Sequence, residues 1–122
     1  MGTPSYVEQA EVRVLPGKSE ELKKLLEQKK AEAYYDLIKV RGEKLSFRGL
    51  NGCKIISYWY KDFCRFLKDI AGFVEGWVLL HCADPEEGSA RLVFKDGKVG
   101  IEICCREWET YTPDDLIREK GR

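Results

Sequence analysis

The strongest constraint in this sequence is the stretch SARLVFKDGKVGIEIC at residues 89–104, where two runs of alternating apolar and polar residues flank an Asp-Gly pair. Asp-Gly favours a two-residue turn between antiparallel strands, because both positions tolerate positive φ. Such a turn fixes the register and places Arg91 opposite Glu102. The pattern predicts a hairpin of strands 89–95 and 98–109. Its apolar face would carry Ala90, Leu92, Phe94, Val99, Ile101 and Ile103.

The remaining elements follow from periodicity and from turn signals. Strands are predicted at 6–15, near 45–48, at 53–60 and at 77–83. One helix is predicted to begin at Ser19, with an apolar stripe that reaches Val40. A second begins at Asp62 and ends at Gly72 or Gly76, and a third spans 113–119. The order β-α-β-β-α-β predicts a single α+β domain over residues 1–122, with a ferredoxin-like split βαβ arrangement, a C-terminal β-hairpin extension and a short terminal helix. Helices would cover one face of its sheet. The open face favours a homodimer.

The stretch EVRVLPGKSEELKKLL, within residues 6–26, resembles the opening strand, Pro-Gly-Lys turn and helix of dimeric α+β barrel proteins, the antibiotic-biosynthesis-monooxygenase-like group. The resemblance implies a similar fold and a dimer. In that group the chain usually ends soon after the fourth strand, whereas here a hairpin and a helix follow. The resemblance implies no reaction and no catalytic residue for this chain.

Composition narrows the class of partner. The chain has 21 Lys and Arg residues and 21 Asp and Glu residues, so it carries no excess positive charge. Proteins that bind nucleic acid usually have such an excess, and nucleic acid is therefore not expected as a partner. The apolar stretches are too short to span a bilayer, and no signal peptide is recognisable. Five cysteines at irregular spacing do not form a secreted disulfide pattern, so a cytoplasmic location is expected. One Asn and two Gln among many Glu and Lys give a thermophile-like composition.

The segment ICCREW, residues 103–108, raises the question of a paired-thiol site. Alternation along the predicted strand places Cys105 on the apolar face and Cys104 on the other face, with Arg106 and Trp108. The two sulfurs then point to opposite sides of the sheet and cannot hold one metal ion together. Cys105 is interpreted as a core residue. Cys104 stays open to a reactive role, because Arg106 would favour its thiolate.

The single histidine, His81, shares a face with Trp77 and Leu79 and is interpreted as an ordinary strand residue rather than an acid–base catalyst. No Cys-x-x-Cys or second histidine provides zinc spacing, and no glycine-rich phosphate loop is present, so neither a metal nor a cofactor is predicted. Whether Cys53, Cys64 and Cys82 converge in space is left open.

Two functions from different classes remain. The first is a non-catalytic interaction or structural domain that homodimerises through its open sheet face. Its interface residues would be Tyr58, Trp59, Tyr60, Arg106 and Trp108, of types enriched at interface anchors. The alternative is a small-molecule-binding protein or an enzyme with a pocket at the sheet face or at the dimer interface. Its polar groups would be Cys104, Arg106 and His81.

Overall fold

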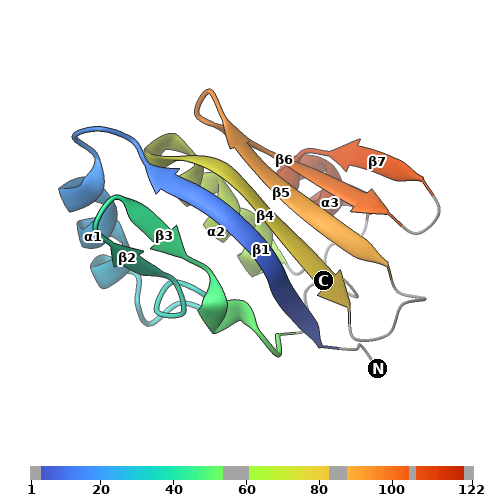
Figure 1. Ribbon diagram of the computed structural model, residues 1–122, viewed down its shortest axis with the longest axis horizontal. Coiled ribbons are helices and arrows are strands. Elements are labelled where there is room, and N and C mark those ends of the chain that lie inside the picture. Colours follow the sequence, from blue (N-terminus) through green and yellow to red (C-terminus); the bar gives the residue numbers. More distant parts are fainter. Residues whose placement is uncertain (1–3, 54–60, 83–87, 105–106, 120–122) are drawn as a thin grey trace.

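The computed structural model describes residues 4–53, 61–82, 88–104 and 107–119 of the 122-residue chain. Within these ranges the strands form one antiparallel sheet in the order β2-β3-β1-β4-β5-β6-β7, as Figure 1 shows. The strands are β1 (Ser5–Val14), β2 (Lys39–Arg41), β3 (Lys44–Ser46), β4 (Val74–Cys82), β5 (Ser89–Lys95), β6 (Lys98–Cys104) and β7 (Trp108–Tyr111). With three helices added, the fold belongs to the predicted α+β class.

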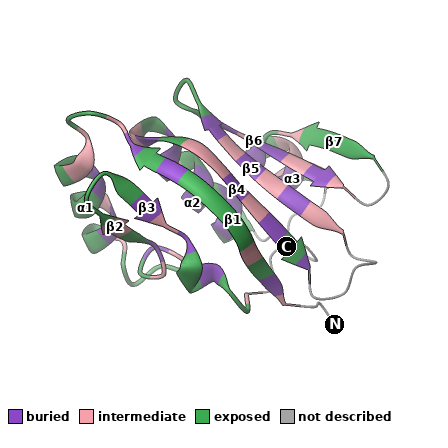
Figure 2. Ribbon diagram, in the orientation of Figure 1, coloured by how far each residue is buried: buried purple, intermediate pink, exposed green. Residues whose placement is uncertain are grey.

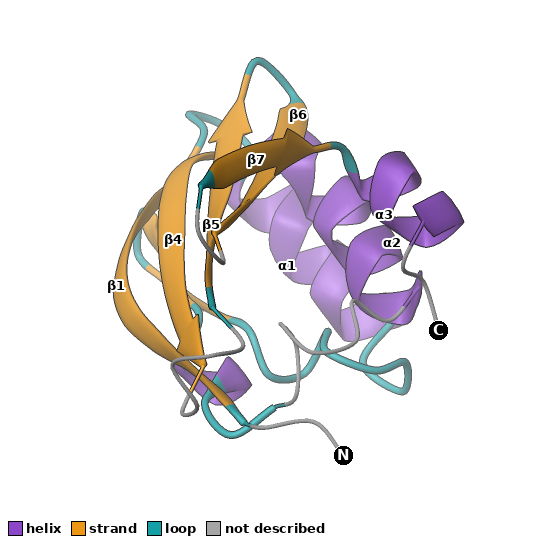
Figure 3. Cartoon of the chain, turned by 90° about the vertical axis from the view of Figure 1, so that its right-hand side faces the viewer, coloured by secondary structure: helices purple, strands orange, loops and turns teal. Residues whose placement is uncertain are grey.

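The helices α1 (Ser19–Gln28), α2 (Lys61–Ile70) and α3 (Pro113–Glu119) all lie on one side of the sheet (Figure 3). The core fills the space between the two layers, and buried positions alternate with exposed ones along the strands (Figure 2). No helix in the described ranges is long and apolar enough to cross a membrane. We call the side of the sheet that these helices leave uncovered the open face.

The β5–β6 hairpin has the predicted register. Asp96 and Gly97 form its turn, with φ of 53° and 75°, and Arg91 pairs with Glu102. All six side chains predicted for the apolar face are buried. The expected strand 98–109 is wrong in one respect, because β6 ends at Cys104 and the chain reverses, so that β7 pairs antiparallel with β6. Alternation cannot locate such a reversal, since the residues on either side of it are all compatible with a strand.

The first helix is shorter than its apolar stripe predicts. It ends at Gln28, and the predicted stripe position Val40 lies in strand β2. Between them the backbone at Tyr34 has φ of +79°, which no helix allows. The rings of Tyr34 and Tyr35 each pack edge-on against a phenylalanine of α2 at a centroid distance of 5.0 Å. Packing on α2 therefore replaces a continued helix.

The segment after α1 differs from the prediction in its strands. β2 and β3 form a hairpin whose turn lies within residues 41–44. A short 3-10 turn at Arg48–Leu50 replaces the end of the strand expected at 45–48. Of the strand expected at 53–60, only Cys53 is described. Its carbonyl oxygen accepts a hydrogen bond of 2.8 Å from the backbone N–H of Ser5. Residues 54–60 lie outside the described part of the chain.

Neither glycine predicted to end the second helix does so. α2 ends at Ile70, and Gly76 lies inside β4 opposite Val12. A Cβ atom at Gly76 would lie 1.9 Å from the carbonyl oxygen of Glu11. The glycine therefore permits a close approach of two strands rather than a helix end.

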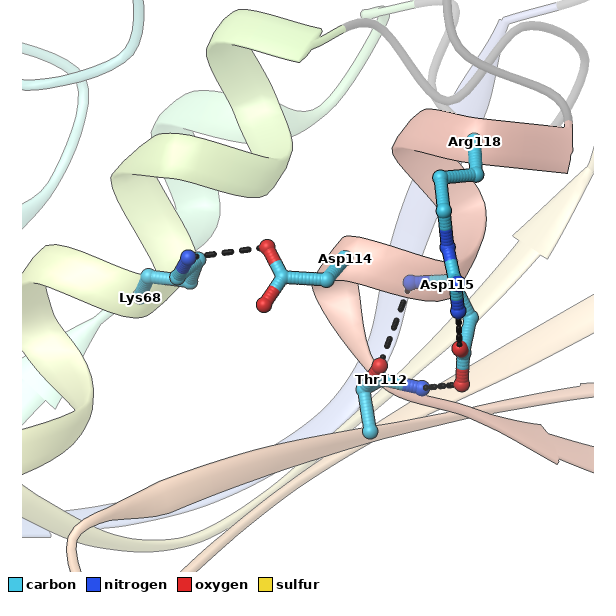
Figure 4. A network of polar contacts seen from close by, with 5 residues as sticks. All are labelled: Lys68, Thr112, Asp114, Asp115 and Arg118. Carbon is cyan, nitrogen blue, oxygen red and sulfur yellow. Dashed lines mark hydrogen bonds and ion pairs between the residues drawn. The ribbon is translucent and has the colours of Figure 1, made fainter.

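The predicted terminal helix is confirmed as α3, and its first turn is capped (Figure 4). The backbone N–H of Asp115 donates to Thr112 Oγ1 at 3.1 Å, and the backbone N–H of Thr112 donates to Asp115 Oδ2 at 3.0 Å. This reciprocal pair is a capping box. Lys68 of α2 donates a 2.8 Å hydrogen bond to Asp114, which ties the start of α3 to its neighbouring helix.

Candidate functional site

The centre of the open face is a shallow apolar hollow of about 400 Å³. Three strands build it, because Gln9 of β1 pairs with Leu79 of β4, and Leu79 pairs in turn with Arg91 of β5. The lining side chains are Gln9, Trp77, Leu79, Arg91 and Val93. Their positions alternate with the buried positions of β4 and β5, which explains why they point away from the helices. The hollow thus combines an apolar floor with one amide and one guanidinium group.

Arg91 is held at the edge of this hollow by two contacts. Its Nε–H donates a 2.5 Å hydrogen bond to Glu102 of β6, and its guanidinium lies 4.7 Å from the ring centroid of Trp108. The first contact neutralises the charge and the second is a cation–π interaction. Trp108 itself stays 45% exposed, so the open face presents a large aromatic ring beside a neutral ion pair.

His81 lies at one end of the open face and contacts two polar side chains from neighbouring strands. Its Nε2 contacts the carboxylate of Glu8, and its Nδ1 lies 2.6 Å from Ser89 Oγ. Glu8 reaches this position because the β1–β4 register shifts between Val7 and Gln9, which leaves Glu8 as the extra residue of a β-bulge. Sequence reasoning identified His81 and its face but missed Glu8 and Ser89. A bulge breaks the alternation on which that reasoning depends.

Three of the seven predicted site residues can be placed. His81, Cys104 and Trp108 are on the open face, and Cys104 is half-buried between its strand partners Ser89 and Trp108. The other four, Tyr58, Trp59, Tyr60 and Arg106, lie outside the described residues, as does Cys105. A pocket at the sheet face was one of the two predicted possibilities, but none of the residues that line the hollow was named as a site residue. The alternation that assigned the buried residues of β4 and β5 also identifies its lining.

The other described cysteines lie apart from this face. Burial, with a smaller effect from the negative charge of Asp114, raises the pKa of the Cys64 thiol to about 11. Burial also raises the pKa of Cys53. In the part of the chain that is described, no three His, Cys, Asp or Glu side chains are arranged to hold a metal ion, and this includes Cys53, Cys64 and Cys82.

A second polar cluster connects the segment after α1 to α2. Tyr35 donates a 2.5 Å hydrogen bond to Asp69, and Lys29 donates one of 2.8 Å to the same carboxylate oxygen. Partial burial raises the pKa of Asp69, but the hydrogen bonds from Lys29 and Tyr35 outweigh it, so this pKa lies below its ordinary value of 3.8. Burial and the hydrogen bond to Asp69 raise the pKa of Tyr35. These groups tie the segment after α1 to α2 on the side of the sheet away from the open face.

The open face is therefore the candidate site, with the hollow at its centre and the Glu8–His81–Ser89 contacts at one end. Comparison of the chain with protein-family models, with curated proteins and with solved structures finds no match.

Proposed function

We propose that the protein is an interaction domain that forms a homodimer through its open face. The observation that carries this proposal is the apolar centre of the face. Trp77, Leu79 and Val93 are only half-buried there. The two large hydrophobic side chains most exposed in the described residues, Tyr6 (46%) and Trp108 (45%), lie on the same face. A contiguous apolar patch rimmed by polar residues is typical of an interaction site.

A second copy of the chain is the partner that the charges of the face favour. In a two-fold contact the same patch of both copies meets, so an unpaired charge near the symmetry axis would face the same charge on the partner and repel it. Arg91 and Glu102 already neutralise each other within one copy. Covering this pair costs less than burying either charge alone. Trp108, stacked beside it, provides an aromatic anchor of the kind that dominates interface energetics.

The strand order supports the ferredoxin-like arrangement as part of this proposal. β1 lies between β3 and β4, while α1 connects β1 to β2 and α2 lies between β3 and β4 in the chain. We infer from this order a split βαβ domain, to which β5, β6 and β7 add further strands. The resemblance of residues 6–26 to dimeric α+β barrel proteins supports the same geometry. The cysteine composition supports a cytoplasmic location.

The test is the oligomeric state of the wild type and of two charge-introducing variants, measured by sedimentation equilibrium across the micromolar range. We expect a dimer for the wild type, a monomer for Leu79→Glu and a dimer for Ala31→Glu. Leu79 is in the hollow, whereas Ala31 is exposed in the segment after α1 and adds the same charge away from the open face. A monomeric wild type, or a Leu79→Glu variant that still dimerises, would contradict the proposal.

The hollow itself supports a second candidate function, the binding of a small molecule. Its floor is apolar, and Gln9 and Arg91 supply polar groups that could orient a ligand. His81 and Cys104 lie on the same face beyond it. Native mass spectrometry of the purified protein would detect a co-purified ligand. Loss of that ligand in an Arg91→Ala variant, with retention in Arg13→Ala at the far end of the face, would support this alternative.

A further inference from the structure

The contacts of His81 form a continuous series from a carboxylate to a hydroxyl. Glu8 of β1 contacts His81 Nε2, and His81 Nδ1 of β4 lies 2.6 Å from Ser89 Oγ of β5. The three residues come from three adjacent strands of one sheet. Many enzymes activate a serine with a carboxylate, an imidazole and the serine hydroxyl in this spatial order.

The carboxylate of Glu8 fixes which ring nitrogen of His81 carries the proton. A carboxylate only accepts hydrogen bonds, so in the neutral ring the N–H must be at Nε2, facing Glu8. Nδ1 then has its lone pair free, and Ser89 must be the donor in the contact at 2.6 Å. Neutral His81 is thus already oriented to remove the hydroxyl proton of Ser89.

The backbone supports this arrangement on both sides of the histidine. The β-bulge that inserts Glu8 directs its side chain to His81, and bulges are over-represented next to active sites. Ser89 is held directly opposite His81 by the β4–β5 register. The side chains of His81 and Glu8 are 47% and 50% exposed, so a molecule in solution can reach the series.

We propose that Ser89 is a nucleophile that accepts an acyl group from a small carboxylic ester. Ser89 Oγ attacks the carbonyl carbon while its proton passes to His81 Nδ1, and Glu8 stabilises the imidazolium that forms. The bond from the carbonyl carbon to the leaving oxygen then breaks, and the leaving alkoxide takes the proton from Nδ1. Water, deprotonated by the same nitrogen, later attacks the acyl-serine, releases the carboxylic acid and restores the hydroxyl. In this scheme Ser89 and His81 are catalytic residues and Glu8 is a positioning residue.

The class of substrate follows from what lies next to Ser89 on the open face. The next residues of β4 and β5 on this face are Leu79 and Arg91, which line the apolar hollow. An ester with a short apolar acyl chain would therefore place that chain over the hollow. The proposal goes beyond the interaction function proposed above and concerns the single copy of the chain, in which the open face and its hollow are uncovered.

The first test uses an alkyl fluorophosphonate, which forms a stable bond to activated serine oxygens. We expect one adduct on the native wild type, located at Ser89 by peptide mapping. Ser89→Ala and His81→Gln should lose it, and Ser46→Ala, which removes a half-buried serine of β3, should keep it. No adduct on the wild type, or labelling that persists in Ser89→Ala, would overturn the proposal. Because the site of the wild-type adduct is itself decisive, the test does not depend on every variant folding.

The second test separates positioning by Glu8 from a merely structural role. Glu8→Gln should slow the labelling of Ser89 by about tenfold or more, because an amide no longer holds the proton at Nε2. Nitrogen-15 NMR of the single histidine should show the Nε2–H tautomer in the wild type and a shift toward the other tautomer in Glu8→Gln. An unchanged tautomer together with an unchanged labelling rate would show that Glu8 has no such role and would remove the basis for an activated serine.

Discussion

Gly76 shows how closely two neighbouring strands approach each other at the scale of one residue. Its φ is +134°, and an added Cβ would lie 1.9 Å from the carbonyl oxygen of Glu11 and 2.8 Å from the Cα of Val12. The atoms that a side chain would meet belong to the backbone of β1, so they cannot move aside without separating β1 from β4. Gly76 lies in β4, the central strand of the sheet.

We expect Gly76→Ala to lower the free energy of unfolding by at least about 2–3 kcal/mol, since it combines an unfavourable φ with a backbone clash. Gly100→Ala is the matched control, because Gly100 lies in β6 and an added Cβ there would meet no atom within 4 Å. The control should change stability by less than about 1 kcal/mol. Urea unfolding followed by far-UV circular dichroism measures both. Equal effects of the two substitutions would contradict the close approach.

At the scale of elements, local signals decide which helices and strands a sequence can reveal. The β5–β6 hairpin was predictable because Asp96 and Gly97 fix a turn between adjacent runs. α3 was predictable because its cap and its helix are contiguous in the sequence. The end of α1 was not predictable, because the residues after Gln28 have good helix propensity and are diverted by distant packing on α2. The hairpin and α3, which depend on neighbouring residues, were therefore predictable from sequence, whereas the end of α1, which depends on tertiary contacts, was not.

The cap of α3 provides a test at this scale. Thr112→Ala removes the acceptor for the backbone N–H of Asp115 (Figure 4) and should lower the free energy of unfolding by about 1 kcal/mol. Thr110→Ala, two residues earlier and exposed in β7, should change it by less than about half of this amount. Thermal and urea unfolding of the two variants against the wild type provide the comparison. A larger loss for Thr110→Ala would argue against the cap as the stabilising feature.

At the scale of the whole molecule, the candidate site depends on pairings between strands that are distant in sequence. Glu8 and His81 meet only because β1 pairs with β4 and because a bulge interrupts that pairing. Nothing in the residues around Glu8 indicates the bulge. By contrast, the faces of His81, Cys104 and Trp108 follow from simple alternation and were predicted. Alternation in the sequence therefore predicts which residues of a strand share a face, but it does not predict which residues of a distant strand lie beside them.

The Asp69 cluster links the stability of the whole fold to pH. The folded-state pKa of Asp69 is lowered, so its contribution is present above the ordinary value of 3.8 and is lost as pH falls below that value. We expect Asp69→Asn to lower the free energy of unfolding by about 1 kcal/mol near neutral pH, a value that allows for the one-third exposure of the side chain. The effect of the substitution should become smaller as pH falls below about 4. Urea unfolding at a series of pH values measures the difference.

The matched control for this experiment is Asp62→Asn on the same helix. Asp62 contacts Arg65 at 3.8 Å with both side chains about two-thirds exposed, so its replacement should change stability by less than about 0.5 kcal/mol. A difference between wild type and Asp69→Asn that stays constant from neutral to acidic pH would show that the carboxylate is not held in its charged form by the fold.

The length of strand β2 has a consequence for the behaviour of the protein at high concentration. β2 forms one edge of the sheet, spans only three residues and exposes Lys39 and Arg41. A short edge that carries positive charge is a poor template for an incoming strand from another chain. This edge of the sheet is therefore poorly suited to strand-by-strand, amyloid-like growth.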